Sequence, residues 1–168
     1  MNALVSIIMG STSDLPIMEK AAKILDELEI PFEMHALSAH RTPEAVEEFA
    51  KNAHVKGIKV IIAGAGMAAH LPGVIASMTC IPIIGVPIKA SLDGLDALLS
   101  IVQMPPGTPV ATVGINAAQN AGLLAAQMLG ISNDEQFTKN LEYKNNLKDK
   151  IVKANQSLSE INYRFKTN

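Results

Sequence analysis

Residues 4–28 read LVSIIMGSTSDLPIMEKAAKILDEL, and this stretch decides the fold. Its first six residues are mostly apolar and rich in branched side chains, which favours a strand that ends at the following glycine. Ser13 or Asp14 can then cap a helix, and Pro16 falls in its first turn, where a missing N–H group costs nothing. Apolar residues recur at helical spacing over the rest of the stretch. It therefore predicts a strand, a short polar loop and an amphipathic helix.

Strands and helices alternate in the same way along the remaining chain. Further strands are expected at 32–37, 58–63, 83–86 and 110–113, and helices at 43–53, 68–78, 95–102 and 117–129. Continuous apolar strands that alternate with helices are typical of a parallel sheet with helices on both of its faces. In a chain of 168 residues, this pattern predicts one α/β domain over residues 1–132.

Residues 133–168 are polar and are predicted to form a helical extension of the same domain. Apolar residues recur there at helical spacing as a narrow stripe, from Phe137 to Phe165. The stripe predicts a long helix that packs on its own domain or on a neighbouring subunit, and a partly ordered tail is the alternative. The helix before it is apolar nearly all round at 121–129 (AGLLAAQML). Because such a helix must be covered on every side, we infer contacts between subunits.

Charged residues are distributed unevenly. The chain has 14 basic and 16 acidic residues and a net charge of −2, which gives no sign of binding to nucleic acid or to an anionic membrane. Between residues 60 and 133, only Lys89, Asp93 and Asp96 are charged. The uncharged stretch 60–88 is long enough to span a bilayer, but glycine and proline interrupt it every few residues, which lipid does not tolerate. We therefore expect a buried segment and no membrane span.

The cysteine and histidine content points to a reducing compartment and away from metal. The only cysteine, Cys80, excludes an internal disulfide framework. One cysteine and four scattered histidines also argue against a structural zinc site. Cys80 is expected to pack late in an apolar helix. Together with the lack of a signal peptide, these features predict a cytoplasmic protein.

In open parallel sheets, ligands bind beyond the carboxyl ends of the strands. The loops expected there are GSTSD at 10–14, SAHRTP at 38–43, GAGMAAHLPG at 64–73 and PIKASLD at 87–93. The first loop suits an anion at a helix N-terminus, and plain helix capping is the alternative. In the second loop, Arg41 offers a fork of donors suited to phosphate, and His40 suits proton transfer near neutral pH. The alternative is an ordinary surface loop.

The third loop matches the dinucleotide fingerprint G-x-G-x-x-A. That fingerprint also needs an acidic residue about 20 positions later for the ribose, and no Asp or Glu occurs from 49 to 92. We therefore interpret the glycines as allowing the backbone to approach a ligand closely. His70 either lines this loop or caps the following helix. A flavin is disfavoured because the chain has no Trp and both tyrosines lie in the tail.

Taken together, the first three loops closely resemble the signatures of the 5-(carboxyamino)imidazole ribonucleotide mutase family, which acts at the phosphoribosylaminoimidazole carboxylase step of purine biosynthesis. Residues 99–105 (LSIVQMP) and 120–126 (NAGLLAA) also resemble this family, and the resemblance covers about residues 4–130. It implies a flavodoxin-like three-layer sandwich that assembles as a homo-octamer, with active sites near subunit contacts. It also implies a ribonucleotide substrate and no metal or organic cofactor.

The resemblance implies an isomerase reaction, in which a carboxylate moves from an exocyclic nitrogen to C4 of the imidazole ring through released CO2. His40 matches the histidine that transfers the proton. The positions that match substrate-binding residues are Ser11, Ser13, Asp14, Ser38, Ala39, Arg41, Gly64, Gly66, Ala68, His70 and Leu71. Met67 departs from the family, which usually has a third glycine there. The alternatives are direct carboxylation of aminoimidazole ribonucleotide by CO2 and a non-catalytic flavodoxin-like module that binds a nucleotide.

Overall fold

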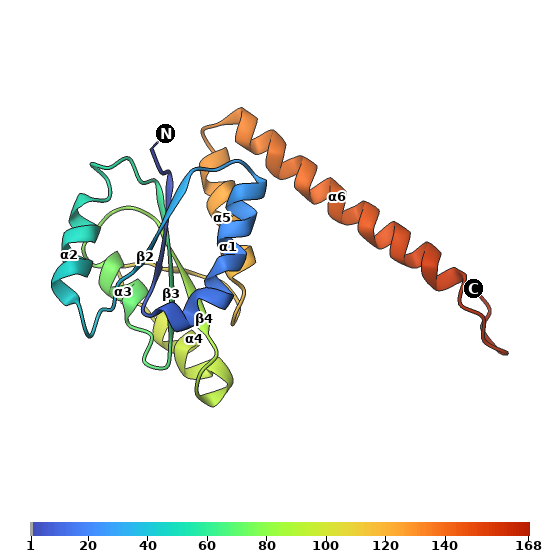
Figure 1. Ribbon diagram of the computed structural model, residues 1–168, viewed down its shortest axis with the longest axis horizontal. Coiled ribbons are helices and arrows are strands. Elements are labelled where there is room, and N and C mark those ends of the chain that lie inside the picture. The colour runs from blue at the N-terminus through green and yellow to red at the C-terminus, as the bar shows by residue number, and fades with distance from the viewer. Residues whose placement is uncertain (1) are drawn as a thin grey trace.

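The computed structural model describes residues 2–168 (Figure 1). Its strands are β1 (Val5–Met9), β2 (Phe32–Ala36), β3 (Val60–Gly66), β4 (Ile83–Ile88) and β5 (Ala111–Thr112). Its helices are α1 (Leu15–Glu27), α2 (Pro43–Asn52), α3 (Leu71–Ala76), α4 (Leu95–Val102), α5 (Ala118–Gly130) and α6 (Asp134–Ser159). Two short 3₁₀ turns, η1 (Thr12–Asp14) and η2 (Leu92–Gly94), precede α1 and α4. Strand and helix alternate as the apolar pattern predicts.

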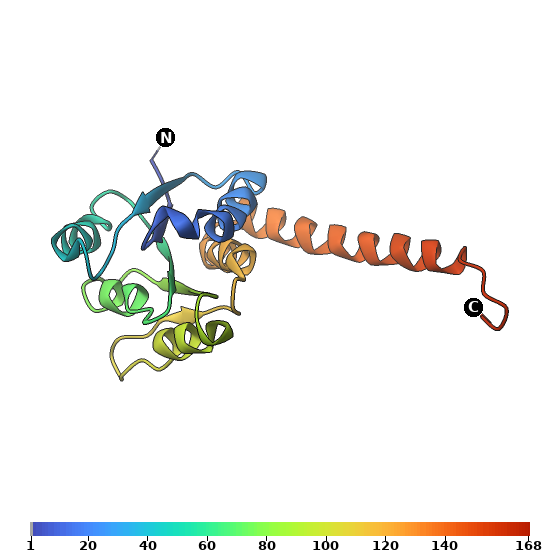
Figure 2. The same cartoon turned by 60° about the horizontal axis from the view of Figure 1, so that its bottom comes forward.

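The strands form one parallel sheet in the order β2-β1-β3-β4-β5. Alternate residues of each strand point to opposite faces, so Ile7 packs on one side and Ile8 on the other. α1 and α5 cover the first face, and α2, α3 and α4 cover the second (Figure 2). The predicted three-layer, flavodoxin-like fold class is confirmed. Within residues 2–168, every helix is too short or too polar to cross a bilayer.

The helix α3 is shorter than the sequence predicts. It ends at Ala76 rather than at residue 78, and hydroxyl groups of the following turn bond to nearby backbone. The Ser77 hydroxyl donates to the Val74 carbonyl at 2.7 Å, and the Thr79 hydroxyl accepts from the Ile81 amide at 3.2 Å. Such bonds compete with a further helical turn. The prediction that Cys80 packs inside a helix is therefore wrong, because Cys80 is exposed in the loop before β4.

The helix α5 finds most of its cover within its own chain. It packs against α1, α6 and the strands β3 and β4. Its contact with α1 is close, because a Cβ at Gly122 would come within 3.0 Å of the Ala21 carbonyl oxygen. Small buried residues such as Ala121 and Ala125 make that approach possible. The apolar composition of α5 is thus largely explained without a neighbouring subunit.

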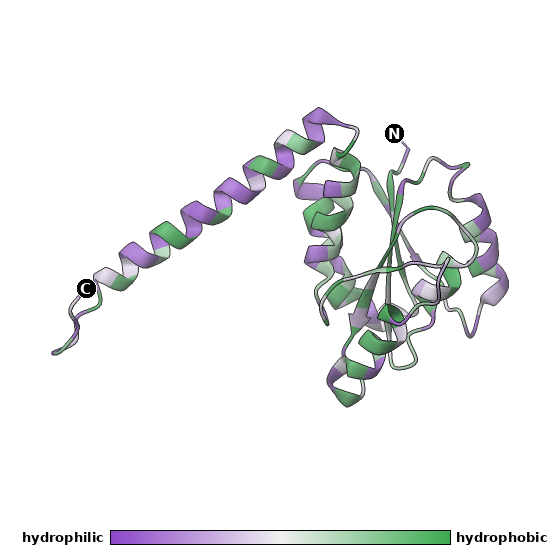
Figure 3. Cartoon of the chain, turned by 180° about the vertical axis from the view of Figure 1, so that it is seen from behind, coloured by the Kyte–Doolittle hydropathy of each residue, from purple (hydrophilic) through white to green (hydrophobic). Residues whose placement is uncertain are grey.

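The helix α6 projects away from the domain over 26 residues, roughly 39 Å (Figure 1). Asn133 caps it by accepting from the Gln136 amide at 3.0 Å. Only its first turns contact the domain, for example through Asn140, whose side-chain amide donates to the Ala126 carbonyl at 2.9 Å. Further along, apolar and polar residues alternate on a helix that extends away from the rest of the domain (Figure 3). Ile151, for example, is 72% exposed.

Candidate functional site

A cavity of about 600 Å³ lies at the carboxyl ends of β1, β2, β3 and β4. All the predicted site residues except Gly64 line it. The lining residues are Gly10, Ser11, Ser13, Asp14, Ile17, Ser38, Ala39, His40, Arg41, Ala65, Gly66, Met67, Ala68, His70, Leu71, Ile88, Lys89 and Ala90. Four loops that are separate in sequence therefore build one site, as the parallel sheet requires.

Gly64 has a packing role one position before the cavity wall. A Cβ at this position would lie 2.4 Å from the sulfur of Met18, which is fully buried on α1. The absence of a side chain lets α1 approach β3 closely at this point. The structure therefore gives a physical reason for this glycine without contact between Gly64 and a ligand.

The first loop places small hydroxyl side chains and one carboxylate at the N-terminal end of α1. The Ser11 hydroxyl accepts from the Ser13 amide at 3.3 Å and so caps η1. Asp14 is partly buried, and this burial raises the pKa of its carboxyl above the usual value. Hydrogen bonds from the Ser11 backbone and the Ser13 hydroxyl partly oppose that rise. The result is a desolvated carboxylate that faces the cavity and can accept hydrogen bonds from sugar hydroxyls.

Replacing Asp14 by Asn is expected to stabilise the free protein and weaken nucleotide binding. The raised pKa means that ionisation is less favourable in the folded than in the unfolded chain, so Asp14 lowers the free energy of unfolding as pH rises through its folded pKa. Asn cannot ionise, so the variant should have a higher free energy of unfolding than the unmodified protein at pH 7. At pH 3, where Asp14 is protonated, this difference should disappear. Loss of charged hydrogen bonds should weaken binding roughly ten- to hundredfold. Thermal melts at pH 3 and 7 and calorimetric titration with nucleotide measure both effects. A variant that binds normally would contradict the role of Asp14.

The second loop is fixed by its own hydrogen bonds. The Ser38 amide donates to the Thr42 hydroxyl at 3.0 Å, and the Thr42 amide donates to the Ser38 carbonyl at 2.9 Å. The Arg41 guanidinium crosses to the first loop, where its Nη2 donates to the Gly10 carbonyl at 2.8 Å. Arg41 thereby holds its charge beside the serines of the first loop. This arrangement suits a phosphate group, which takes charge-assisted and neutral donors together.

His40 and His70 are brought together from different loops. His40 Nε2 lies 2.9 Å from His70 Nδ1, and the rings meet edge to face with centroids 5.0 Å apart. One nitrogen of this contact must donate and the other must accept. His70 stands at the N-cap of α3 but makes no capping bond with its side chain, so it lines the cavity. A proton can therefore be exchanged within a pair of imidazoles that faces the cavity.

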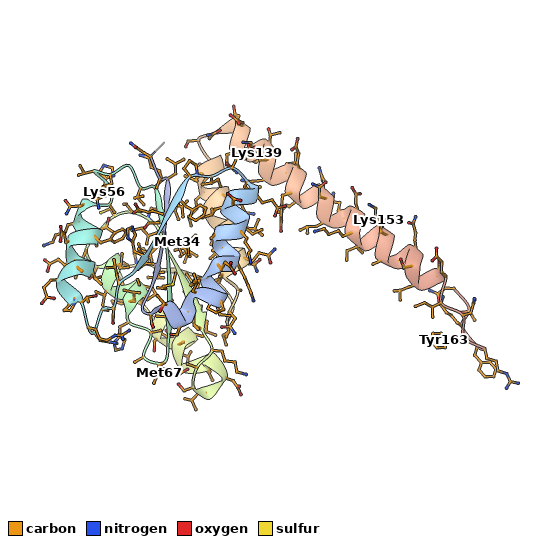
Figure 4. All side chains as sticks on the ribbon, viewed as in Figure 1. Met34, Lys56, Met67, Lys139, Lys153 and Tyr163 are labelled. Atoms are coloured by element: carbon orange, nitrogen blue, oxygen red, sulfur yellow. The ribbon has the colours of Figure 1, made fainter. Side chains whose placement is uncertain are left out.

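The third loop contains a residue in an unfavourable backbone conformation. Met67 has φ 54°, in the left-handed region that costs a side-chain-bearing residue roughly 1–2 kcal/mol. This geometry explains why glycine suits the position, and nothing in the structure explains why Met67 stands there instead. The Met67 side chain lines the cavity and is 61% exposed (Figure 4). An exposed apolar side chain is thus part of the cavity wall.

Sequence reasoning missed part of the cavity wall. Ile17, Ala65, Ile88, Lys89 and Ala90 line it and were not among the predicted site residues. The signal for Lys89 was available, because it is the only Lys or Arg between residues 60 and 133 and it follows a strand. The apolar residues gave no such signal. Over residues 2–168, no three His, Cys, Asp or Glu side chains are grouped to hold a metal ion.

Comparison with known proteins shows the family of this chain. The sequence pattern of the family described as AIRC, AIR carboxylase, matches residues 4–150. N5-carboxyaminoimidazole ribonucleotide mutase of Thermotoga maritima is 58% identical over 95% of this chain and 94% of its own. Phosphoribosylaminoimidazole carboxylase of Candida glabrata is 54% identical, over 95% of this chain but 28% of its own. The crystal structure of Treponema denticola PurE superposes with a TM-score of 0.84 at 30% identity, covering 93% of this chain and 98% of that one. The chain belongs to the AIR carboxylase family.

Proposed function

We propose that this protein is an N5-carboxyaminoimidazole ribonucleotide mutase of purine biosynthesis. The observation that carries the proposal is the juxtaposition of His40 and His70 with Arg41 in one cavity, in a chain 58% identical to a protein of that name. The substrate is a ribonucleotide with a carboxylate on the exocyclic nitrogen. The product has that carboxylate on ring C4.

The serines of the first loop and Arg41 bind the 5′-phosphate, and Asp14 accepts from the ribose hydroxyls. The imidazole ring then lies against the small residues of the third loop, close to the histidine pair. This placement uses binding energy at the phosphate to position the reacting ring. Ala65, Gly66 and Ala68 make this part of the wall small enough for the flat ring to pack closely.

His40 carries the proton through the reaction. When the N–C bond to the carboxylate breaks, CO2 is released and the exocyclic nitrogen takes up one proton. C4 then attacks CO2, a new C–C bond forms, and the proton on C4 leaves. One proton is taken from the enzyme and one is returned, so His40, with His70 as its hydrogen-bond partner, can supply and recover it. The reaction balances without any external acid or base.

Direct carboxylation of aminoimidazole ribonucleotide is the second candidate function. It is favoured by the Candida glabrata relative, which is named for a carboxylase and is 54% identical over the aligned region. The two reactions share the step in which C4 attacks CO2. They differ in the nucleotide that enters the site.

The test supplies each nucleotide separately to the purified protein. A mutase converts the N-carboxylated nucleotide in buffer freed of bicarbonate, and it shows little turnover of aminoimidazole ribonucleotide at physiological bicarbonate. Faster turnover of aminoimidazole ribonucleotide with bicarbonate would establish the carboxylase instead. If the protein bound both nucleotides but converted neither, the remaining interpretation would be a non-catalytic module that binds a nucleotide.

We also propose a homo-octamer, the assembly implied by the family resemblance, in the cytoplasm. The exposed stripe on α6 supports an assembly, because apolar side chains on a projecting helix gain from burial against another copy. The open cavity supports it as well, since His40 and Arg41 are exposed in a single chain and a dry site needs further cover. The free cysteine Cys80 supports a reducing compartment.

Changing Leu147 and Ile151 together to Lys is expected to shift the assembly to smaller species. Both side chains are exposed apolar residues of α6, and charge at a buried contact is costly. Sedimentation equilibrium should give eight times 17.8 kDa for the unmodified protein and a lower mass for the variant. Lys153→Gln, on the same helix, is the matched control and should leave the mass unchanged. A monomeric unmodified protein would contradict the proposal.

A further inference from the structure

Two cationic side chains line the cavity, and they stand at opposite ends of it. Arg41 follows β2 and Lys89 follows β4. The Arg41 guanidinium is bound to the Gly10 carbonyl, directly after β1. The sheet order β2-β1-β3-β4 puts two strand spacings between β1 and β4, which is roughly 10 Å. The histidine pair comes from the loops after β2 and β3. A ligand with an anionic group at each end could therefore meet one cation at each end of the site.

Arg41 is already engaged by protein groups. Its Nη2 donates to the Gly10 carbonyl, and its Nε lies 3.4 Å from the Ser38 hydroxyl. These contacts fix the guanidinium beside the first loop, where Ser11 and Ser13 add donors. That end of the cavity is suited to a phosphate dianion.

The Lys89 side chain is held more weakly than that of Arg41. Its ammonium lies 2.7 Å from the Asp93 carboxylate, and the two side chains are 56% and 88% exposed. Exposed ion pairs of this kind contribute about 0–1 kcal/mol, so a ligand carboxylate can replace Asp93 at little cost. No other acidic side chain forms an ion pair with Lys89 among the described residues.

The backbone around Lys89 is held firmly although its side chain is not. The Lys89 amide donates to the Asn116 side-chain oxygen at 2.9 Å, and the Asn116 amide donates to the Pro87 carbonyl at 2.8 Å. Asp93 lies in the turn that follows, with φ 54°, between two other residues of positive φ. The lysine is thus presented from a fixed point directly after β4, one residue beyond Ile88, which pairs with Gly66 of the third loop.

The substrate class of the proposed function has an anionic group at each end. Its phosphate is attached to the ribose, and its carboxylate to the imidazole. If the phosphate binds at Arg41 and the imidazole lies against the third loop, as proposed above, the carboxylate would extend toward the ends of β3 and β4. We propose that Lys89 is a specificity-determining residue that leaves Asp93 and pairs with the carboxylate of the nucleotide. This inference rests on the proposed function and adds a recognition group to it.

The pairing should act mainly on affinity. Substrate and product both carry the carboxylate, so a cation that binds it stabilises both ground states and lowers KM more than it raises kcat. It also distinguishes carboxylated nucleotides from aminoimidazole ribonucleotide, which lacks the group. Lys89 is therefore expected to favour the mutase substrate over the carboxylase substrate.

The decisive experiment measures equilibrium binding of two nucleotides to the Lys89→Gln variant. One ligand is 4-carboxy-5-aminoimidazole ribonucleotide, and the other is aminoimidazole ribonucleotide. The variant should bind the carboxylated ligand about tenfold more weakly, the lower end of the range for a charged hydrogen bond. Binding of the uncarboxylated ligand should stay within twofold. KM for the N-carboxylated substrate should rise by a similar factor with a smaller change in kcat.

Three further variants separate recognition from a structural role. Lys89→Arg should restore most of the affinity because it keeps the charge. Asp93→Asn should leave affinity for the carboxylated ligand equal or higher, because it removes a competitor; a merely structural ion pair would make it behave like Lys89→Gln. Lys56→Gln is the control, because Lys56 is exposed at the end of the domain away from Met67 and the cavity (Figure 4).

Two results would overturn the inference. Equal weakening of both ligands in Lys89→Gln would mean that Lys89 meets the phosphate, and unchanged binding of both would mean that it meets neither group. Failure of the unmodified protein to bind either nucleotide would refute the proposed function itself, and the role of Lys89 with it. The unmodified protein thus distinguishes the two kinds of failure.

Discussion

Replacing His40 by Asn is expected to lower kcat by about a hundredfold or more while the fold remains intact. Asn preserves polarity but cannot take up and return a proton, and loss of a general acid–base group typically costs this much. His40 is exposed at the cavity, so its replacement leaves no unfilled space in the core. Steady-state turnover of the N-carboxylated nucleotide and a thermal melt of the same sample measure the two expectations.

His54→Asn is the matched control for this variant. His54 is also an exposed histidine, but it follows α2 and does not line the cavity. It should keep normal turnover. If His40→Asn retained more than about a tenth of normal kcat, another group would have to carry the proton, and His70 would be the first candidate because of its 2.9 Å contact.

Replacing Arg41 by Gln is expected to lower kcat/KM by roughly a hundredfold or more, chiefly through KM. The change removes the charge beside the first loop and the bond from Nη2 to the Gly10 carbonyl, so the phosphate loses its cation and the two loops lose their link. Arg41→Lys should recover only part of the loss, because an ammonium cannot hold Gly10 and a phosphate in the same fork geometry. Initial rates over a range of substrate concentrations separate the two parameters.

Arg164, the only other arginine, provides the control for this change. It lies in the exposed tail, and Arg164→Gln should leave both parameters unchanged. A second readout is inhibition by ribose 5-phosphate, which should weaken in Arg41→Gln. If inhibition by this compound were unaffected, the phosphate would bind elsewhere and the orientation of the nucleotide would have to be reversed.

The sequence predicted the fold because each strand and helix has a strong local pattern. β3 is a continuous apolar run and β1 is interrupted only by Ser6, and α1 and α2 have clear amphipathic spacing, so local preference and burial agree. Two features were not predicted. The end of α3 follows from local hydrogen bonds of Ser77 and Thr79 to nearby backbone, which the apolar pattern does not reveal. The cover of α5 by α1 and α6 depends on contacts between distant segments.

The candidate site was largely predictable for a similar reason. Reactive and small residues stand directly after strands, and parallel strands bring such loops together. The sequence could not show that His40 Nε2 would meet His70 Nδ1, because that contact depends on how two loops lie across the sheet. Gly64 was predicted to bind the ligand because its motif resembles a ligand-binding loop. The structure instead gives it a packing role, because a side chain at this position would clash with Met18 on the neighbouring helix.

The order of the elements along the chain has a consequence for synthesis on the ribosome. All cavity-lining residues fall between positions 10 and 90, so the whole site has been synthesised before α5 begins at Ala118. Until α5 emerges, one face of β3 and β4 lacks its cover, including Ile62 and Ile84, which are fully buried in the finished fold. Nascent chains that expose such surface are prone to aggregation and are bound by chaperones. Pauses in translation between residues 90 and 130 would therefore prolong the most vulnerable stage of this protein's production.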